Sequence, residues 1–330
     1  MPRVAIGLPV YNGARFLRET LDNLRAQTFG DYVLVVVDNA SSDGTEAIVR
    51  ATMAEDERIH FVRNPRNLGA TRNHNRAFAE TARFEAPYFR WAAFDDLLAP
   101  TYLADTVAVL DAHPDAVLAH PAVRLVDEDG RDLPYDAEVG GFDLPGGGFW
   151  PYRLTDTDAL SAADPVVRYA SALGSGPAVY VTHGLIRTDA LAATRGYQLH
   201  GVEDVLMAEL ALRGRFVRLD APLFLMRMHG GSTHHMSRDE YLAYESGETE
   251  RPLGRASYRR AFNFLRAVRE APLTVAEKRR AIRAWTRFAV RPQQLRRLFV
   301  PGPNNYFGIN FSKAMPNDER IPAARKPQHI

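Results

Sequence analysis

The chain of 330 residues contains no cysteine. This absence excludes a disulfide framework, a thiolate zinc site and a cysteine nucleophile, and it fits a reducing compartment. The sequence also lacks any apolar run near the roughly 20 residues that a membrane-spanning helix needs. The apolar stretch at the N-terminus is too short for a signal peptide. We therefore expect a cytoplasmic protein.

Acidic residues are scarce near the C-terminus. From Arg251 onward the chain has 18 basic and 4 acidic residues, although the net charge of the whole chain is +1. No nucleic-acid recognition motif accompanies this charge, so we expect no nucleic-acid partner. Two basic amphipathic helices are predicted after Ser257. They could contact an anionic membrane at its inner face, or pack on the acidic remainder or in a homodimer. We expect packing, because their aromatic side chains need a cover.

Strand-like and helix-like segments alternate through about the first 115 residues. Such alternation predicts βαβ units and an α/β, Rossmann-like, mostly parallel sheet with flanking helices. Further strands are expected at 177–187, 215–219 and 221–229, and a helix at 202–214. The region 140–156 is rich in glycine and proline and is expected to be a long surface loop. The first four predicted strands are RVAIGLP, YVLVVVD, RIHFVR and PYFRWAAF.

Polar residues follow each of these four strands. Ligands of parallel sheets bind at the carboxyl ends of the strands, so these residues point to one binding edge. Buried carboxylates are costly unless they are paired or bound to a metal. The sets, in chain order, are Pro9 to Asn12, Asp38 with Asn39, Asn64 to Asn67, and Asp95 with Asp96.

Four segments occur in the order and spacing of a family 2, GT-A-type glycosyltransferase. They are GLPVYNGARFLRETLDNLRAQT, VVDNASSDGT, RNLGATRNHNRA and AAFDD. The later segments VEDVLMAELALRGRF and RMHGGST are similar to the C-terminal catalytic segments of that family. The resemblance covers about residues 3–235.

The resemblance implies an inverting transferase with a GT-A fold. It would move a hexose from a UDP- or dTDP-type nucleotide-sugar donor to an acceptor hydroxyl, with help from Mg²⁺ or Mn²⁺. The acceptor would be a glycan, a lipid-linked carrier or a natural product. We expect the transferase domain at 1–235, with a nucleotide-binding half to about 115 and an acceptor half at 116–235. A helical basic extension at 236–330 would follow, poorly ordered from Pro301.

The same resemblance assigns a set of donor-binding residues. Asp38 would contact the nucleobase, and Arg72 would meet a phosphate near a helix N-terminus. Other interpretations stay open: Asp38 could cap the next helix, Tyr11 could be ordinary packing, and Arg72 could be solvated. The predicted donor-binding residues are Pro9, Val10, Tyr11, Asn12, Asp38, Asn67, Gly69, Arg72, Asn75 and Asp96.

Asp95 is the predicted metal ligand, because hard oxygen ligands suit Mg²⁺ or Mn²⁺. If the strand continues through the pair, the Asp96 side chain points to the opposite face from Asp95 and turns back toward the protein, where it supports the metal ligand. His229 is a second candidate ligand by resemblance, or an ordinary polar residue. The pair could also only cap a turn. The usual family pattern is Asp-x-Asp, and Ala93 stands in place of its first carboxylate, so a non-catalytic nucleotide-sugar-binding protein is the alternative function.

Asp204 is the predicted catalytic base, with Glu203 as its support. The resemblance places a Glu-Asp pair at the start of a helix, and a neighbouring carboxylate raises the pKa of such a base. The alternative is a pair of first-turn acids that interact with the helix dipole. A dinucleotide-dependent dehydrogenase also fits the alternation, but GLPVYNG after the first strand lacks the G-x-G-x-x-G pattern.

Overall fold

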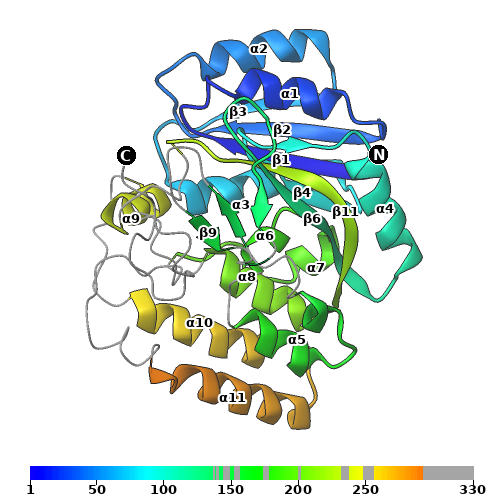
Figure 1. Ribbon diagram of the computed structural model, residues 1–330, viewed down its shortest axis with the longest axis vertical. Coiled ribbons are helices and arrows are strands. Elements are labelled where there is room, and N and C mark those ends of the chain that lie inside the picture. The colour runs from blue at the N-terminus through cyan, green and yellow to red at the C-terminus, as the bar shows by residue number, and fades with distance from the viewer. Residues whose placement is uncertain are drawn as a thin grey trace.

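The computed structural model describes residues 1–136, 138, 141–143, 149–151, 157–173, 178–199, 202–231, 238–247 and 256–292. Within these residues, an eight-stranded sheet lies between two layers of helices (Figure 1). Two buried apolar clusters cover its two faces. The predicted poorly ordered end from Pro301 lies outside the described residues.

The eight-stranded sheet is mostly parallel, as the alternation predicted. Its spatial order is β3-β2-β1-β4-β10-β6-β11-β5. Strands β10 and β5 run antiparallel to their neighbours, and the other pairs are parallel. The strands are β1 Val4–Val10, β2 Tyr32–Asp38, β3 Ile59–Arg63, β4 Tyr88–Trp91, β5 Leu97–Leu98, β6 Ala116–Val126, β10 Leu185–Arg187 and β11 Arg215–Arg227.

Strand β2 shows why the sheet is covered on both sides. Every one of its residues is buried. Val33 and Val35 pack into one apolar cluster, while Leu34 and Val36 pack into the other. Successive side chains of a strand point to opposite faces, so a continuous apolar run serves two layers at once.

The helices divide between the two faces. One layer contributes to the cluster that holds Leu34, and the other to the cluster that holds Val33. On the first face lie α1 Leu17–Arg25, α2 Thr45–Glu55 and α4 Tyr102–Ala112. On the second lie α3 Ala70–Thr81, α5 Pro165–Ala172, α6 Ala178–Val181, α7 Thr188–Ala192 and α8 Val202–Ala211.

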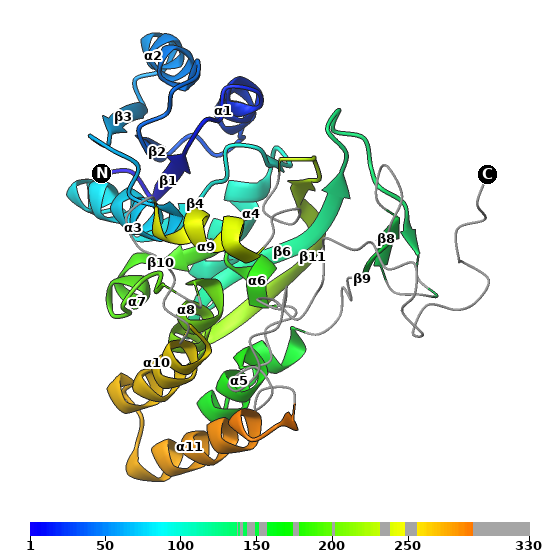
Figure 2. The same ribbon diagram turned by 90° about the vertical axis from the view of Figure 1, so that its left-hand side faces the viewer.

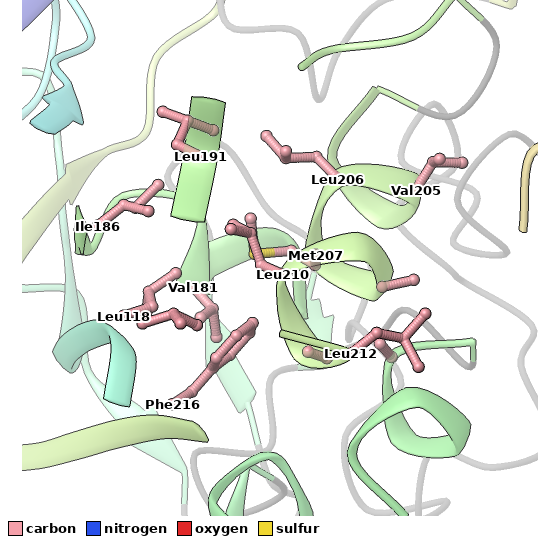
Figure 3. Packing of buried hydrophobic residues seen from close by; sticks show 14 of the residues in the cluster. Leu118, Val181, Ile186, Leu191, Val205, Leu206, Met207, Leu210, Leu212 and Phe216 are labelled. Carbon is pink, nitrogen blue, oxygen red and sulfur yellow. The ribbon is translucent and has the colours of Figure 1, made fainter. Parts of the chain in front are cut away.

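Helix α8 is buried on most sides, between the sheet and the helices α5, α6 and α10 Ala256–Glu270. Its apolar side chains pack against Leu118 of β6, Ile186 of β10 and Phe216 of β11 (Figure 3). Met207 and Leu210 are fully buried in this cluster. Such packing fixes the helix, and with it the two carboxylates of its first turn.

Three expectations for the second half were wrong. The predicted strand at 177–187 is the helix α6 followed by the three-residue strand β10. The two predicted strands at 215–229 form one strand, β11, with a register shift between Leu219 and Phe224. The predicted long loop contains part of a small antiparallel sheet, formed by β7 Tyr135–Asp136, β8 Gly141–Asp143 and β9 Phe149–Pro151.

The three C-terminal helices pack on the transferase-like body. Helix α9 Arg238–Ser246 contacts α3, α10 Ala256–Glu270 contacts α8, and α11 Val275–Ala289 contacts α5 (Figure 2). Phe264 of α10 is fully buried, whereas Phe262 is 63% exposed. No helix among the described residues has the length and hydropathy needed to cross a membrane.

Candidate active site

The loops after β1 and β2 are tied together. Asn12 adopts a left-handed backbone conformation with φ 51°, which asparagine tolerates better than most residues. Its backbone N–H donates to Ser41 Oγ at 2.8 Å, and its side-chain oxygen accepts from Ser42 N–H at 2.9 Å. Pro9 and Val10 are buried within β1, whereas Tyr11 is exposed at the edge. Tyr11 and Asn12 are both exposed, so a ligand could reach either side chain of this loop.

Asp38 is completely buried at the end of β2. Its Oδ1 accepts from Ser41 N–H at 3.0 Å, and its Oδ2 forms an ion pair with Arg63 of β3. The carboxylate therefore closes the turn after its own strand. A contact with a nucleobase stays a prediction, and it requires Arg63 to move.

A network of asparagines joins the ends of β2 and β3 to helix α3. Asn39 donates to Asn67 Oδ1 at 2.8 Å, and Asn64 donates to Asn39 Oδ1 and Asn73 Oδ1, each at 2.8 Å. Asn73 in turn donates to Val37 O at 3.0 Å. The sequence placed Asn39, Asn64 and Asn67 at strand ends but gave no sign of these mutual bonds. The side-chain oxygen of Asn67 is therefore hydrogen-bonded to another side chain of the protein.

Gly69 permits a close approach, but to the protein backbone. It has φ 80°, and an added Cβ would lie 2.4 Å from Gly247 N, just after α9. Asn75 is also engaged internally, because its amide exchanges two hydrogen bonds of 2.9 Å with the backbone of Tyr197. The donor-binding roles of both residues stay predictions.

Arg72 lines a pocket of about 360 Å³ between the start of α3 and helix α10. Arg259 and the exposed ring of Phe262 form its α10 side, and Gln198 forms part of the loop side. Two guanidinium groups around one hollow suit an anionic group. The predicted phosphate contact of Arg72 is compatible with this position.

The turn after β4 holds the first carboxylate pair. Because β4 ends at Trp91, the pleat of a continuing strand does not set the two directions. Asp95 Oδ2 nevertheless lies 2.9 Å from His229 Nε2, while Asp96 Oδ1 accepts from the backbone N–H of Arg227 at 2.9 Å. Burial, and then the charge of Asp95, raise the pKa of Asp96. Asp96 therefore faces the protein, and its predicted donor-binding role stays a prediction.

Arg227, at the end of β11, forms hydrogen bonds that hold this turn in place. It was not among the site residues predicted from the sequence. Its buried guanidinium donates to Asp95 O at 2.9 Å and to Glu128 O at 2.6 Å. A further donor group forms an ion pair with Glu19 of α1 at 2.7 Å. One arginine thus links the ends of β4, β6 and β11.

Asp95 and His229 supply an oxygen and an imidazole nitrogen, which are ligand types that divalent ions accept. Asp95 Oδ2 and His229 Nε2 lie 2.9 Å apart, which is a hydrogen-bond distance, so a bound ion would replace this contact. No group of three or more possible protein ligands occurs among the described residues. Mg²⁺ commonly binds one or two protein groups together with substrate phosphates and water. Metal binding by this pair stays a prediction.

The second carboxylate pair stands in the first turn of α8. Burial, followed by the charge of Asp204, raises the pKa of Glu203 to about 8. Asp204 is also buried, and its Oδ2 forms an ion pair with Arg260 of α10. Its Oδ1 has no hydrogen-bond partner among the described residues. One carboxylate is thus largely neutral near pH 7, and the other is held beside a permanent cation.

Tyr244 of α9 links the two carboxylate pairs. The pKa of its hydroxyl is raised by burial and then by the charges of Asp95 and Glu203. An aromatic contact makes a second link, because the rings of Trp91 and Tyr197 lie 4.6 Å apart, between the end of β4 and the segment before α8. One carboxyl group of each pair, Asp95 and Glu203, therefore lies within electrostatic reach of Tyr244. The carboxylate of Asp38 is completely buried.

Residues 5–165 match the sequence model described as Glycosyl transferase family 2. An uncharacterized glycosyltransferase of Rickettsia felis is 30% identical over 136 residues, which cover 41% of this chain and 22% of that protein. The putative glycosyltransferase EpsE of Bacillus subtilis is 30% identical over 146 residues, covering 42% of this chain and 51% of EpsE. The matched region thus spans about half or less of these relatives. The family resemblance is confirmed.

Solved structures share the fold. Residues 1-349 of S. aureus TarS in complex with UDP-GlcNAc superpose with a TM-score of 0.58 over 90% of this chain and 78% of that fragment, at 17% identity. The mannosyltransferase PcManGT of Pyrobaculum calidifontis, in complex with GDP-Man and Mn²⁺, has a TM-score of 0.51 over 90% of this chain and 73% of its own, also at 17% identity. The predicted GT-A fold is confirmed.

Proposed function

We propose, from the premise that residues 5–165 carry the glycosyl transferase family 2 match, that this protein transfers a hexose from a nucleotide-diphosphate donor to an acceptor hydroxyl. The donor is of the UDP or dTDP type, and the anomeric configuration is inverted. The observation that carries the proposal is the position of Asp95 and Glu203, one carboxyl group of each pair, within electrostatic reach of Tyr244.

Asp204 acts as the base in this scheme. Its Oδ1, which has no hydrogen-bond partner among the described residues, accepts the proton of the acceptor hydroxyl as the acceptor oxygen attacks the anomeric carbon. The new bond forms as the bond between the sugar and the diphosphate oxygen breaks, and the diphosphate carries away that electron pair. A single displacement of this kind inverts the anomeric centre. Positioned proton transfer contributes about 10²- to 10⁴-fold to such reactions.

Glu203 supports the assignment of the base. With a pKa of about 8, it is mostly protonated near neutrality and is a hydrogen-bond donor rather than a base. Its neutral state spares Asp204 a second negative charge in the same buried turn. The two adjacent carboxyl groups therefore have different roles.

Asp95 and His229 would hold Mg²⁺ or Mn²⁺ against the donor diphosphate. When bound, the ion would neutralise the charge that develops on the leaving group. Tyr11 offers its exposed face at the same sheet edge, and Arg72 offers a cation beside α3. These side chains supply the surface for the nucleotide and the phosphates.

The test compares binding with turnover. Purified protein is mixed with Mn²⁺ and a panel of UDP- and dTDP-hexoses, and both the shift in melting temperature and the release of nucleoside diphosphate are measured. We expect at least one donor to bind and be turned over, and Asp204→Asn to abolish turnover while keeping the binding shift. A protein that binds none of the donors refutes the proposal.

A non-catalytic nucleotide-sugar-binding protein is the second candidate. Ala93, in the turn after β4, supplies no carboxylate where the family has one. This candidate predicts a donor-induced rise in melting temperature without nucleotide release, unaffected by Asp204→Asn. The same experiment therefore separates the two functions.

A further inference from the structure

We propose that Arg260 of α10 is a positioning residue of the active site, which holds Asp204 as a carboxylate and engages only one of its two oxygens. This inference rests on the proposed function, because it takes Asp204 as the base. It assigns a chemical role to a helix that the sequence suggested only for packing or for membrane contact.

The ion pair between Arg260 and Asp204 is shielded from water. The side chain of Arg260 is 13% exposed and that of Asp204 is 8% exposed. Surface ion pairs contribute little because water and salt screen them. A buried pair couples strongly, and the loss of one partner leaves the other charge uncompensated. The guanidinium of Arg260 and the carboxylate of Asp204 are therefore in contact with little screening by water.

The position of Arg260 is fixed by its own helix. Its guanidinium lies 5.5 Å from the centre of the Phe264 ring, one turn along α10. Phe264 is fully buried, and Tyr169 of α5 donates a hydrogen bond of 2.9 Å to its carbonyl oxygen. Helix α10 also packs directly on α8. The cation is thus held in place by the core and does not depend on a mobile surface chain.

The other charged groups around this turn would not replace Arg260. Glu203 is the neighbour on α8, and Tyr197 and Tyr244 are the titratable groups that face Glu203 from the preceding segment and from α9. All three are acids. Arg168 of α5 donates to Ala211 O, at the opposite end of α8.

The contact also gives the two oxygens of Asp204 different environments. Oδ2 is engaged by Arg260, while Oδ1 is buried without a hydrogen-bond partner among the described residues. A buried carboxylate without a cation tends to take up a proton, and a protonated Asp204 cannot serve as a base. In the proposed role, Arg260 engages Oδ2 and leaves Oδ1 as the oxygen that takes up the acceptor proton.

The experiment uses the full chain with two substitutions at one position. Arg260→Gln removes the charge but keeps a hydrogen-bonding side chain of similar reach, and Arg260→Lys keeps the charge. The matched control is Arg266→Ala, because Arg266 lies on the exposed side of α10 and pairs with Glu270. For each variant, kcat is measured across pH 5 to 9, together with the melting temperature and its shift on donor binding.

We expect Arg260→Gln to move the acid side of the kcat profile up by about one to three pH units, because an opposite charge at contact has an effect of that size. Near pH 6 this lowers kcat by about 10-fold or more. The donor-induced shift stays, Arg260→Lys restores the acid side, and Arg266→Ala matches the wild type. A purely structural role would lower the melting temperature without moving the pH profile.

Two failures are distinguishable. If the wild type binds a donor but turns over none, the proposed function fails and this inference falls with it. If the wild type is active and Asp204→Asn is not, but Arg260→Gln keeps the wild-type pH profile, the inference alone is wrong. If Arg260→Gln does not fold, the lysine variant decides, because a shifted acid side despite the retained charge contradicts the proposal.

Discussion

The turn after β4 and the first turn of α8 each hold two adjacent carboxyl groups. The two turns reduce the cost of burying two neighbouring acids in different ways. In each pair, burial and a neighbouring charge raise the pKa of one member, Asp96 or Glu203. The other member contacts a nitrogen-bearing side chain. Two buried acids side by side do not both carry a charge at low cost, so each turn divides into a protonatable and a paired member.

The difference lies in the partner. Asp95 contacts the imidazole of His229, which can be neutral and can bind a metal ion. Asp204 contacts the guanidinium of Arg260, which stays charged throughout the useful pH range. The first arrangement suits a ligand site whose partner can change, and the second suits a base whose charge must persist. Four predictions test this comparison.

The largest effect is expected at the second pair. Asp204→Asn should lower kcat by about 10²- to 10⁴-fold, because the amide cannot take the acceptor proton. Glu203→Gln is the matched control, and should retain much more activity, since Glu203 is already mostly protonated near pH 7. Steady-state nucleotide release measures both. Equal losses in the two variants would show that the pair is not divided as described.

The first pair should respond to metal. Asp95→Asn should lower activity at saturating donor by about 100-fold, because a bound cation contributes several kcal/mol of charge stabilisation. Chelation of divalent ions should inactivate the wild type, and added Mn²⁺ should restore it. Asp96→Asn is the control with a smaller loss, because its amide oxygen can still accept from the Arg227 N–H. Activity that resists chelation contradicts a metal role for Asp95.

Helix α9 carries Tyr244. A side chain added at Gly69 should displace this helix. Gly69→Ala should destabilise the fold and reduce activity by about 10-fold, because its Cβ would meet the backbone after α9. Gly130→Ala is the matched control, since it has a similar φ of 79° but nothing within 4 Å of the added Cβ. Melting temperature and kcat are compared. Equal effects would mean that backbone strain alone explains the loss.

The smallest effect concerns stability against pH. The pKa of Glu203 is raised in the folded state, so the folded protein binds the proton more tightly than the unfolded chain does. Its contribution to stability is present below about pH 4.5 and is lost progressively as the pH rises to about 8. Urea unfolding at pH 5, 6.5 and 8 should show Glu203→Gln gaining stability over the wild type as pH rises. Glu57→Gln, on the exposed surface, should show no such trend.

The first four strands were predictable because each is a short apolar run closed by polar residues. Strand β6 was not predicted, although it lies deep in the sheet. Its sequence includes His120 and Pro121, and a proline cannot donate to a neighbouring strand. The structure accommodates it where β11 changes register, because Leu219 is the last residue paired before the shift and faces Pro121.

Parts of the candidate site were visible and parts were not. Asp95, His229 and Asp204 stood out by their residue types and their place in family-like segments, although their chemical roles stay predictions. Arg227 begins the family-like segment RMHGGST but was not predicted as a site residue, and Arg260 lies in no such segment. Arginines are common along the chain, and nothing local distinguishes one that reaches a partner 56 or 132 residues away.

The sequence by itself determined the alternation of strands and helices, the edge where polar residues gather, and the acids available there, because these follow from local periodicity and residue chemistry. Tertiary structure alone decided which nitrogen-bearing side chain contacts Asp95 and Asp204, and which neighbouring acid has its pKa raised by burial. Charge states depend on distance and on access to water, and both arise when segments far apart in the chain pack together.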